Sequence, residues 1–168
     1  MRLKTTLVIT LTLFALLMPF QAAKAEEVAR IPLDSLDNLG LRLLIDRAQK
    51  TEGRAALKIE TQWPTLVCLG QVTDLDIENS QLLFKARVRT QLQGAAYLEM
   101  WCHFGDKAYF SKGLNNPAKG NSDWQQLQTP FILQKGQRPD KITLNLVING
   151  HGTVWVDEVI VVKTALQQ

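Results

Sequence analysis

The sequence has 168 residues, with 19 Lys and Arg against 16 Asp and Glu and a formal net charge of +3. Its 46% apolar and 21% charged residues are typical of a globular protein and exclude a disordered polyelectrolyte. The surplus positive charge comes from Arg2, Lys4 and Lys24, so that Glu26–Gln168 is formally neutral. The basic balance therefore gives no reason to expect nucleic acid or an anionic membrane as a partner.

The first 25 residues have the layout of a secretory signal peptide. A positive start at residues 2–4 precedes an apolar run at 7–20, and Ala23-Lys24-Ala25 places small residues where signal peptidase reads them. The run is shorter than the ~20 residues of a spanning helix, and Pro19 would disrupt its end, which favours cleavage over membrane anchoring. We expect a signal-peptide helix at 1–25, cleavage after Ala25, and export to the periplasm or out of the cell.

The remaining residues, 26–168, are expected to form one domain, since their number suits a single core. Apolar and polar residues alternate in 82–89, 96–104 and 141–149, which is typical of strands with one buried face. Further strands are expected at 55–61, 66–72, 124–131 and 153–163. The expected core residues are Phe84, Leu98, Met100, Trp124, Leu144 and Leu146.

Turn signals separate these strands. Asn149-Gly150-His151-Gly152 is expected to form a tight hairpin because Asn and Gly tolerate positive φ, and a long loop is expected over 113–122. The stretch Leu33–Lys50 keeps neither period, and we expect a helical turn there with some irregular or strand structure. Many short strands with almost no helix predict an all-β jelly-roll β-sandwich of two antiparallel sheets.

Cys68 and Cys102 are the only cysteines. They fit either one disulfide in an oxidising compartment or two buried free thiols. The sequence has only two histidines, His103 and His151, and no Cys or His pair with zinc-ligand spacing. A Ser or Cys catalytic triad is therefore not expected, and we predict no enzymatic activity.

Three segments occur in a distinctive order between about Glu52 and Val162: Glu52-Gly53-Arg54-Ala55-Ala56-Leu57-Lys58-Ile59, then Ser122-Asp123-Trp124, then Gly152-Thr153-Val154-Trp155-Val156-Asp157-Glu158-Val159. This order resembles the CenC-like carbohydrate-binding modules, which are galactose-binding-like jelly rolls. The resemblance implies a module that binds carbohydrate without catalysis. It also implies a structural Ca²⁺ at Asp157, although the family's N-terminal Phe-Glu partner motif has no match in Leu36-Asp37-Asn38-Leu39-Gly40.

The candidate binding site is the outward side of strand 96–104. Alternate strand residues face the same way, and the side chains on this face are Tyr97, Glu99, Trp101 and His103. Arg87 and Arg89 would join them if strand 82–89 lies in the same sheet. Trp101 or Tyr97 would support the apolar face of a sugar ring, and Glu99, Arg87 and His103 would bind its hydroxyls.

Other interpretations of these residues stay open. The face could be a solvated sheet surface, with Trp101 partly covered by a loop and Glu99 paired to an Arg. Trp155 could be a second sugar platform, although we expect it to pack beneath a loop.

The sequence therefore predicts an exported, non-catalytic module that binds carbohydrate or another cell-envelope ligand. Nucleic acid is not an expected partner, and no membrane span is expected after residue 25. The alternative is a structural or protein-interaction sandwich that docks onto a partner protein. A third hypothesis is an uncharacterised glycoside hydrolase in which Glu99 supplies one of the two carboxylates.

Overall fold

The structure, a computed structural model, describes residues 25–31 and 43–166. Every regular element in these ranges is a strand: β1 (Glu26–Ile31), β2 (Leu44–Asp46), β3 (Ala56–Thr61), β4 (Thr65–Thr73), β5 (Ser80–Phe104), β6 (Lys107–Lys112), β7 (Ala118–Leu133) and β8 (Lys141–Ala165). All strand pairs are antiparallel, so the predicted all-β class is confirmed. The described residues include no helix able to cross a membrane. Residues 1–24 of the predicted signal peptide lie outside these ranges, and its cleavage stays a prediction.

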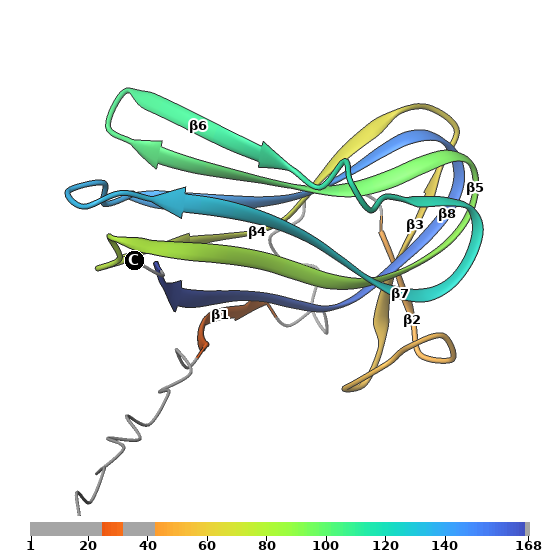
Figure 1. Cartoon of the computed structure of the whole chain (residues 1–168). Coiled ribbons are helices and arrows are strands. Elements are labelled where there is room, and N and C mark those ends of the chain that lie inside the picture. The colour runs from red at the N-terminus through yellow and green to blue at the C-terminus, as the bar shows by residue number, and fades with distance from the viewer. Residues whose placement is uncertain (1–24, 32–42, 167–168) are drawn as a thin grey trace, which may run out of the picture.

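Two long strands, β5 and β8, form the centre of the fold. They pair from Ser80 opposite Ala165 to His103 opposite Lys141. Figure 1 shows both strands turning back on themselves, so that one sheet folds over into two facing layers. The expected strands 82–89 and 96–104 are thus two halves of β5, and 141–149 and 153–163 are two halves of β8.

The bend occurs where Gly94 of β5 pairs with Gly150 of β8. A Cβ on Gly94 would overlap the carbonyl oxygen of Asn149, and a Cβ on Gly150 would overlap that of Gln93. Their φ angles of +139° and +146° also favour glycine over any L side chain. The expected hairpin at 149–152 is therefore wrong: the glycines let two paired backbones approach closely at a bend, and β8 continues through it.

Each half of β5 lies in a different layer. The first half lies between β7 and the second half of β8, which also pairs with β1 and β3, and β2 pairs with β3. The second half lies between β6 and the first half of β8, which pairs on its other side with β4. The two layers enclose the core, which includes five of the six expected residues: Phe84, Leu98, Met100, Leu144 and Leu146.

Two local expectations need correction. Trp124 is half-buried rather than part of the core, because the register of β7 against β5 shifts between Val88 and Thr90 and places Trp124 in the irregular stretch. The predicted loop over 113–122 is shorter, since β7 already begins at Ala118. In Leu33–Lys50, the described residues form β2 and a bend, which agrees with the expected strand and irregular structure; residues 33–42 lie outside the described ranges, and the helical turn stays a prediction.

The two cysteines are free thiols. Cys102 is buried among the inward-facing residues of β5. Cys68 of β4 pairs with Asn145 of β8, which in turn pairs with Glu99 on the outward side of β5, so Cys68 faces outward. Because the two side chains face opposite sides of one layer, the disulfide alternative is not formed. Burial raises the pKa of Cys102 to about 12.

Candidate functional site

The layer that contains the second half of β5 carries all four predicted residues of strand 96–104 on its outward side. Strand register aligns each of them with side chains from neighbouring strands. We call this surface the Trp101 face and describe it as four rows across the strands. The rows are Leu66–Val147–Tyr97, Cys68–Asn145–Glu99–Lys112, Gln71–Thr143–Trp101–Phe110 and Thr73–Lys141–His103–Ala108.

Glu99 forms the buried polar centre of the Trp101 face. Only 4% of it is exposed, although it points away from the core. Its Oε1 accepts a hydrogen bond from Trp101 Nε1 at 2.6 Å and one from Asn145 Nδ2 at 3.4 Å. Lys112 Nζ lies 3.3 Å from the other carboxylate oxygen. The alternative interpretation paired Glu99 with an Arg; the partner is Lys112, because β6 places that residue directly opposite Glu99.

Asn145 is also 4% exposed, and its Oδ1 is a buried acceptor without a hydrogen-bond partner in the described part of the chain. A buried acceptor without a donor typically costs about 1–3 kcal/mol. Two adjacent buried polar groups on the outer side of a sheet are unusual, because such a surface is ordinarily solvated. The burial of Glu99 and Asn145 therefore distinguishes this row from a solvated, charged sheet surface.

Trp101 is half-buried and packs against Phe110 from β6. The two ring centroids lie 4.8 Å apart with an interplanar angle of 42°, an offset geometry favourable for aromatic pairs. Lys112 Nζ lies 4.9 Å from the Phe110 ring centroid. The Trp101 side chain is thus supported by a ring on one side and fixed by the Glu99 carboxylate at its N–H.

His103 lies in the last of the four rows of the Trp101 face. Its Nε2 lies 3.1 Å from Thr143 Oγ1. Burial, together with the positive charge of Lys141, lowers the pKa of His103 below the usual 6.5. The neutral form of this imidazole, which offers one donor and one acceptor, is therefore favoured.

The arginines expected to join this face do not. Arg87 and Arg89 lie on the first half of β5, beyond the bend at Gly94, so their outward side belongs to the other layer. Arg87 Nε is 3.9 Å from a Glu158 carboxylate oxygen. The guanidinium of Arg89 lies 5.6 Å from the Trp155 ring centroid. The condition of a shared sheet is met, since both halves of β5 pair with β8, but the bend separates the arginines from Trp101.

Trp155 is buried, as expected. Its Nε1 donates a hydrogen bond of 2.9 Å to Asp46 Oδ2, and Asp46 also accepts backbone hydrogen bonds from Ala48 and Gln49. Trp155 therefore packs beneath the turn that follows β2 and does not provide a second platform.

Asp157, the residue linked to calcium by the resemblance, is surrounded by hydrogen-bond donors. Its Oδ2 accepts from Thr51 N, Thr51 Oγ1 and Glu52 N at 2.7–3.0 Å, and its Oδ1 accepts from Glu158 N at 2.9 Å. A calcium site needs several oxygen ligands. Within the described ranges, no three His, Cys, Asp or Glu side chains gather as a metal site. The calcium expectation thus stays a prediction that this donor set does not favour.

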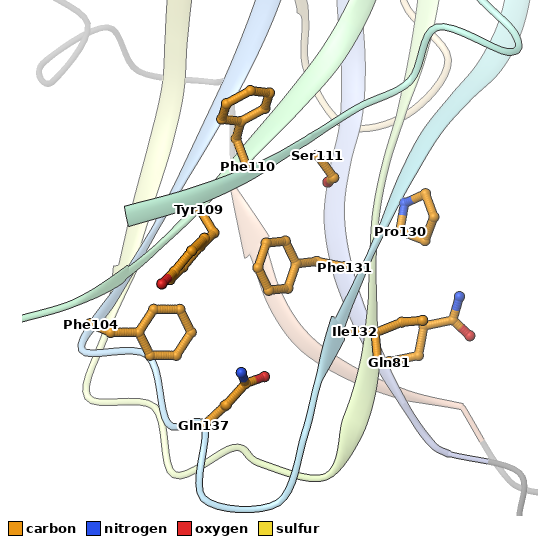
Figure 2. Close-up of a pocket in the computed structure, with 9 residues that line it drawn as sticks. All are labelled: Gln81, Phe104, Tyr109, Phe110, Ser111, Pro130, Phe131, Ile132 and Gln137. Carbon is orange, nitrogen blue, oxygen red and sulfur yellow. The ribbon is translucent and has the colours of Figure 1, made fainter. Parts of the chain in front are cut away.

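Sequence reasoning missed a cleft of about 470 Å³ between the edges of the two layers. It is formed by β6 and β7 together with both ends of β5 and the loop before β8. Figure 2 shows the rings of Phe104, Tyr109 and Phe131 turned toward one shared space, with Gln137 beside it. The other lining residues are Gln81, Phe110, Ser111, Pro130 and Ile132. The adjacent Tyr109 and Phe110 in a short polar segment were the sequence signal for this cleft.

Phe110 links the cleft to the Trp101 face. It lines the cleft and also packs against Trp101. β6 thus borders both surfaces: Phe110 pairs with outward Trp101, whereas its neighbour Tyr109 pairs with inward Cys102. Predicting this arrangement requires the register between β5 and β6. The period-two alternation within a single strand does not contain that information.

No protein-family model and no curated protein matches the sequence. Solved structures do match the fold. The CBM22-1 xylan-binding domain of Xyn10C from Paenibacillus barcinonensis has a TM-score of 0.59 at 11% identity, over 87% of this chain and 99% of that one. A family 16 carbohydrate-binding module has a TM-score of 0.54 at 11% identity, over 78% of this chain and 97% of that one.

A third similar structure is a Stig cyclase, Fisc, from Fischerella sp. TAU, with a TM-score of 0.52 at 15% identity over 72% of this chain and 70% of that one. At such low identities these likenesses establish the fold alone. They confirm the jelly-roll β-sandwich of carbohydrate-binding modules, whereas membership of the CenC-like family stays a prediction. One fold hosts several functions, so the function has to be argued from the site.

Proposed function

We propose that the chain is an exported, non-catalytic carbohydrate-binding module and that the Trp101 face holds the sugar. The observation that carries this proposal is the fixed orientation of Trp101. Its indole is hydrogen-bonded to buried Glu99 and packed on Phe110, although it lies on the outer side of a sheet. A rigid aromatic side chain with a polar edge offers contact area at small entropic cost.

The chemistry around Trp101 suits a neutral sugar. The indole face supplies an apolar surface for the C–H side of a pyranose ring. Neutral His103 and the hydroxyl of Thr143 lie in neighbouring rows and can exchange hydrogen bonds with sugar hydroxyls. Because Lys112 is paired with Glu99, the centre of the face carries no uncompensated charge.

Glu99 is better suited to positioning than to catalysis. Its carboxylate is held by Trp101, Asn145 and Lys112. A glycosidase needs a second carboxylate ~5–10 Å from the first, and the four rows of the Trp101 face contain no other Asp or Glu. This supports a module without a reaction of its own. Turnover of a chromogenic glycoside that Glu99→Gln abolishes would contradict it.

A glycan array followed by titration tests the proposal. Xylan fragments belong in the first set of probes, since one structure of this fold is a xylan-binding domain. Trp101→Ala should weaken binding of the selected glycan at least tenfold, equivalent to about 1.4 kcal/mol. Trp63→Ala is the matched control, because Trp63 is 69% exposed in the turn before β4 and lies outside the face. Full affinity in folded Trp101→Ala would contradict the site.

A glycan array on which no glycan binds would favour the alternative function. If no glycan binds and a protein is captured reproducibly from cell-envelope extract, the alternative of a protein-interaction sandwich replaces this proposal. The export part has a separate test. Mass spectrometry of the protein recovered from an expressing bacterium should give an N-terminus at Glu26, and an intact N-terminus would contradict cleavage after Ala25.

A further inference from the structure

We propose that the cleft between β6 and β7 is a second binding site, which takes an uncharged small molecule with an aromatic ring. This inference does not depend on sugar binding by the Trp101 face. It rests on the shape of the cleft, its lining, and the charges that flank it.

The cleft is a gap between two edge strands that belong to different layers. Among the described strands, β6 and β7 each pair only with β5. They are tied together where Thr129 Oγ1 donates a hydrogen bond of 3.0 Å to Ser111 Oγ. Beyond this contact the strands leave a volume of about 470 Å³, which is within the range of small-molecule sites.

The lining selects for an aromatic occupant. Phe104 and Tyr109 meet edge to face, with ring centroids 6.0 Å apart and an interplanar angle of 64°. Phe131 faces the same space from β7 (Figure 2). Rings at such angles present both faces and edges, so an inserted ring can make offset and edge-to-face contacts at once.

The lining also selects against charge. None of its nine residues is Asp, Glu, Lys, Arg or His. Moving a charged group from water into such a cleft leaves it without a partner, which is strongly unfavourable. The polar groups that line it are neutral: the amides of Gln81 and Gln137 and the hydroxyl groups of Ser111 and Tyr109. These groups can hydrogen-bond a hydroxyl or carbonyl on the edge of an uncharged ring.

A small molecule fits this cleft better than an added strand does. β6 begins with Lys107 and ends with Lys112. Lysines on an edge strand are a common means of preventing pairing with another chain. Yet Tyr109 and Phe110 between them, and Ile132 across the cleft, remain exposed. Exposed apolar side chains gathered around one cleft mark a binding site more often than a solvated surface.

The test uses 2-naphthol as a neutral probe and 2-naphthoate as its anionic counterpart, titrated into the purified protein at about pH 7. We expect saturable one-to-one binding of 2-naphthol and binding of 2-naphthoate at least tenfold weaker. If 2-naphthol binding does not saturate, or if the two probes bind with equal affinity, the proposal is overturned.

Variants locate the site. Ile132→Lys adds a charge to the lining at a side chain that is 54% exposed, so folding should be preserved. It should weaken 2-naphthol binding at least tenfold. Leu114→Lys is the matched control, since Leu114 is 57% exposed and does not line the cleft. Equal effects of the two substitutions would overturn the assignment.

Competition separates this inference from the proposed function. Tyr97→Ala should change 2-naphthol affinity less than twofold, because Tyr97 lies in a row of the Trp101 face that does not contain Phe110. A glycan bound at the Trp101 face should not displace the probe. Displacement would make the cleft part of the sugar site and overturn its independence. If no glycan binds at all but 2-naphthol does, the proposed function fails and the cleft assignment stands.

Discussion

The indole N–H of Trp101 donates a hydrogen bond of 2.6 Å to Glu99 Oε1, between residues two positions apart on the outward side of β5. This side-chain hydrogen bond joins two residues on the same face of one strand. Here the bond fixes the plane of the aromatic ring, while Lys112 and Asn145 hold the carboxylate. We therefore propose that Glu99 positions Trp101.

Substitution of Glu99 tests this relationship. Glu99→Gln keeps an oxygen for the indole N–H, whereas Glu99→Ala leaves both the indole and Lys112 without their partner. We expect Glu99→Ala to weaken glycan binding about tenfold, or about 1.4 kcal/mol, and Glu99→Gln to retain most of the affinity. The indole N–H resonance of Trp101 should move in Glu99→Ala and stay near its original position in Glu99→Gln. Equal binding by both variants, with an unmoved resonance, would show that Glu99 does not position Trp101.

The paired glycines at the bend should be essential for stability. Gly150→Ala places a Cβ against the carbonyl oxygen of Gln93 at a φ of +146°, so both overlap and backbone strain apply. We expect a loss of about 3 kcal/mol or more in the free energy of unfolding, measured with denaturant. Gly105→Ala is the control, because Gly105 has a φ of +56° but open space around its Cβ position. That change should cost only about 1 kcal/mol, and similar losses in both variants would refute the close-approach argument.

Asp157 should stabilise the turn at Thr51 and Glu52 through hydrogen bonds. Asp157→Asn replaces one acceptor oxygen with an NH₂ group amid N–H and O–H donors. We expect a loss of about 2 kcal/mol, because a buried donor is left facing other donors. Asp106→Asn, at an exposed turn, should change little. We also expect calcium and a chelator to leave the Tm of the parent protein unchanged; a rise with calcium would instead support the metal site.

His103 should make stability depend on pH. Its pKa is lowered in the folded state by burial and by Lys141, so the unfolded chain binds a proton more readily. Stability from the neutral imidazole is complete above the unfolded pKa of about 6.5. It should decline as pH falls below that value and level off once His103 is also protonated in the folded state. Unfolding curves of the parent protein and His103→Gln should differ in slope across this window. Identical slopes would contradict the assignment.

The thiols should remain separate. Because Cys102 is buried and its pKa is about 12, it should react with an alkylating reagent only after unfolding. A reducing agent should leave the Tm unchanged. Mass spectrometry that finds a Cys68–Cys102 disulfide in the native protein would contradict the structure.

Local patterns in the sequence were enough to predict the buried sides of β5 and β8. Phe84 and Leu98 are both even-numbered residues of β5, and even-numbered residues are again buried after the bend, where Gly94 itself is exposed. The bend itself depends on Gly94 meeting Gly150, which lies far away in sequence. For this reason the predicted hairpin at 149–152 is wrong, and Arg87 lies on the other layer rather than on the Trp101 face.

Side chains on one strand were placed correctly, whereas partners from other strands were not predictable. Tyr97, Glu99, Trp101 and His103 share a face because alternation is local. Lys112 and Asn145, which hold Glu99, come from β6 and β8 and require the strand register. The cleft was missed for the same reason, since β6 and β7 meet only in the folded sandwich.

The most direct measurement is an NMR titration of the labelled protein with a xylan fragment or the first glycan selected on an array. We predict that the largest shifts occur at the Trp101 indole and in the rows of Glu99 and His103. Shifts confined to the opposite layer, around Arg87 and Trp155, or no shifts with any glycan, would contradict carbohydrate binding by the Trp101 face.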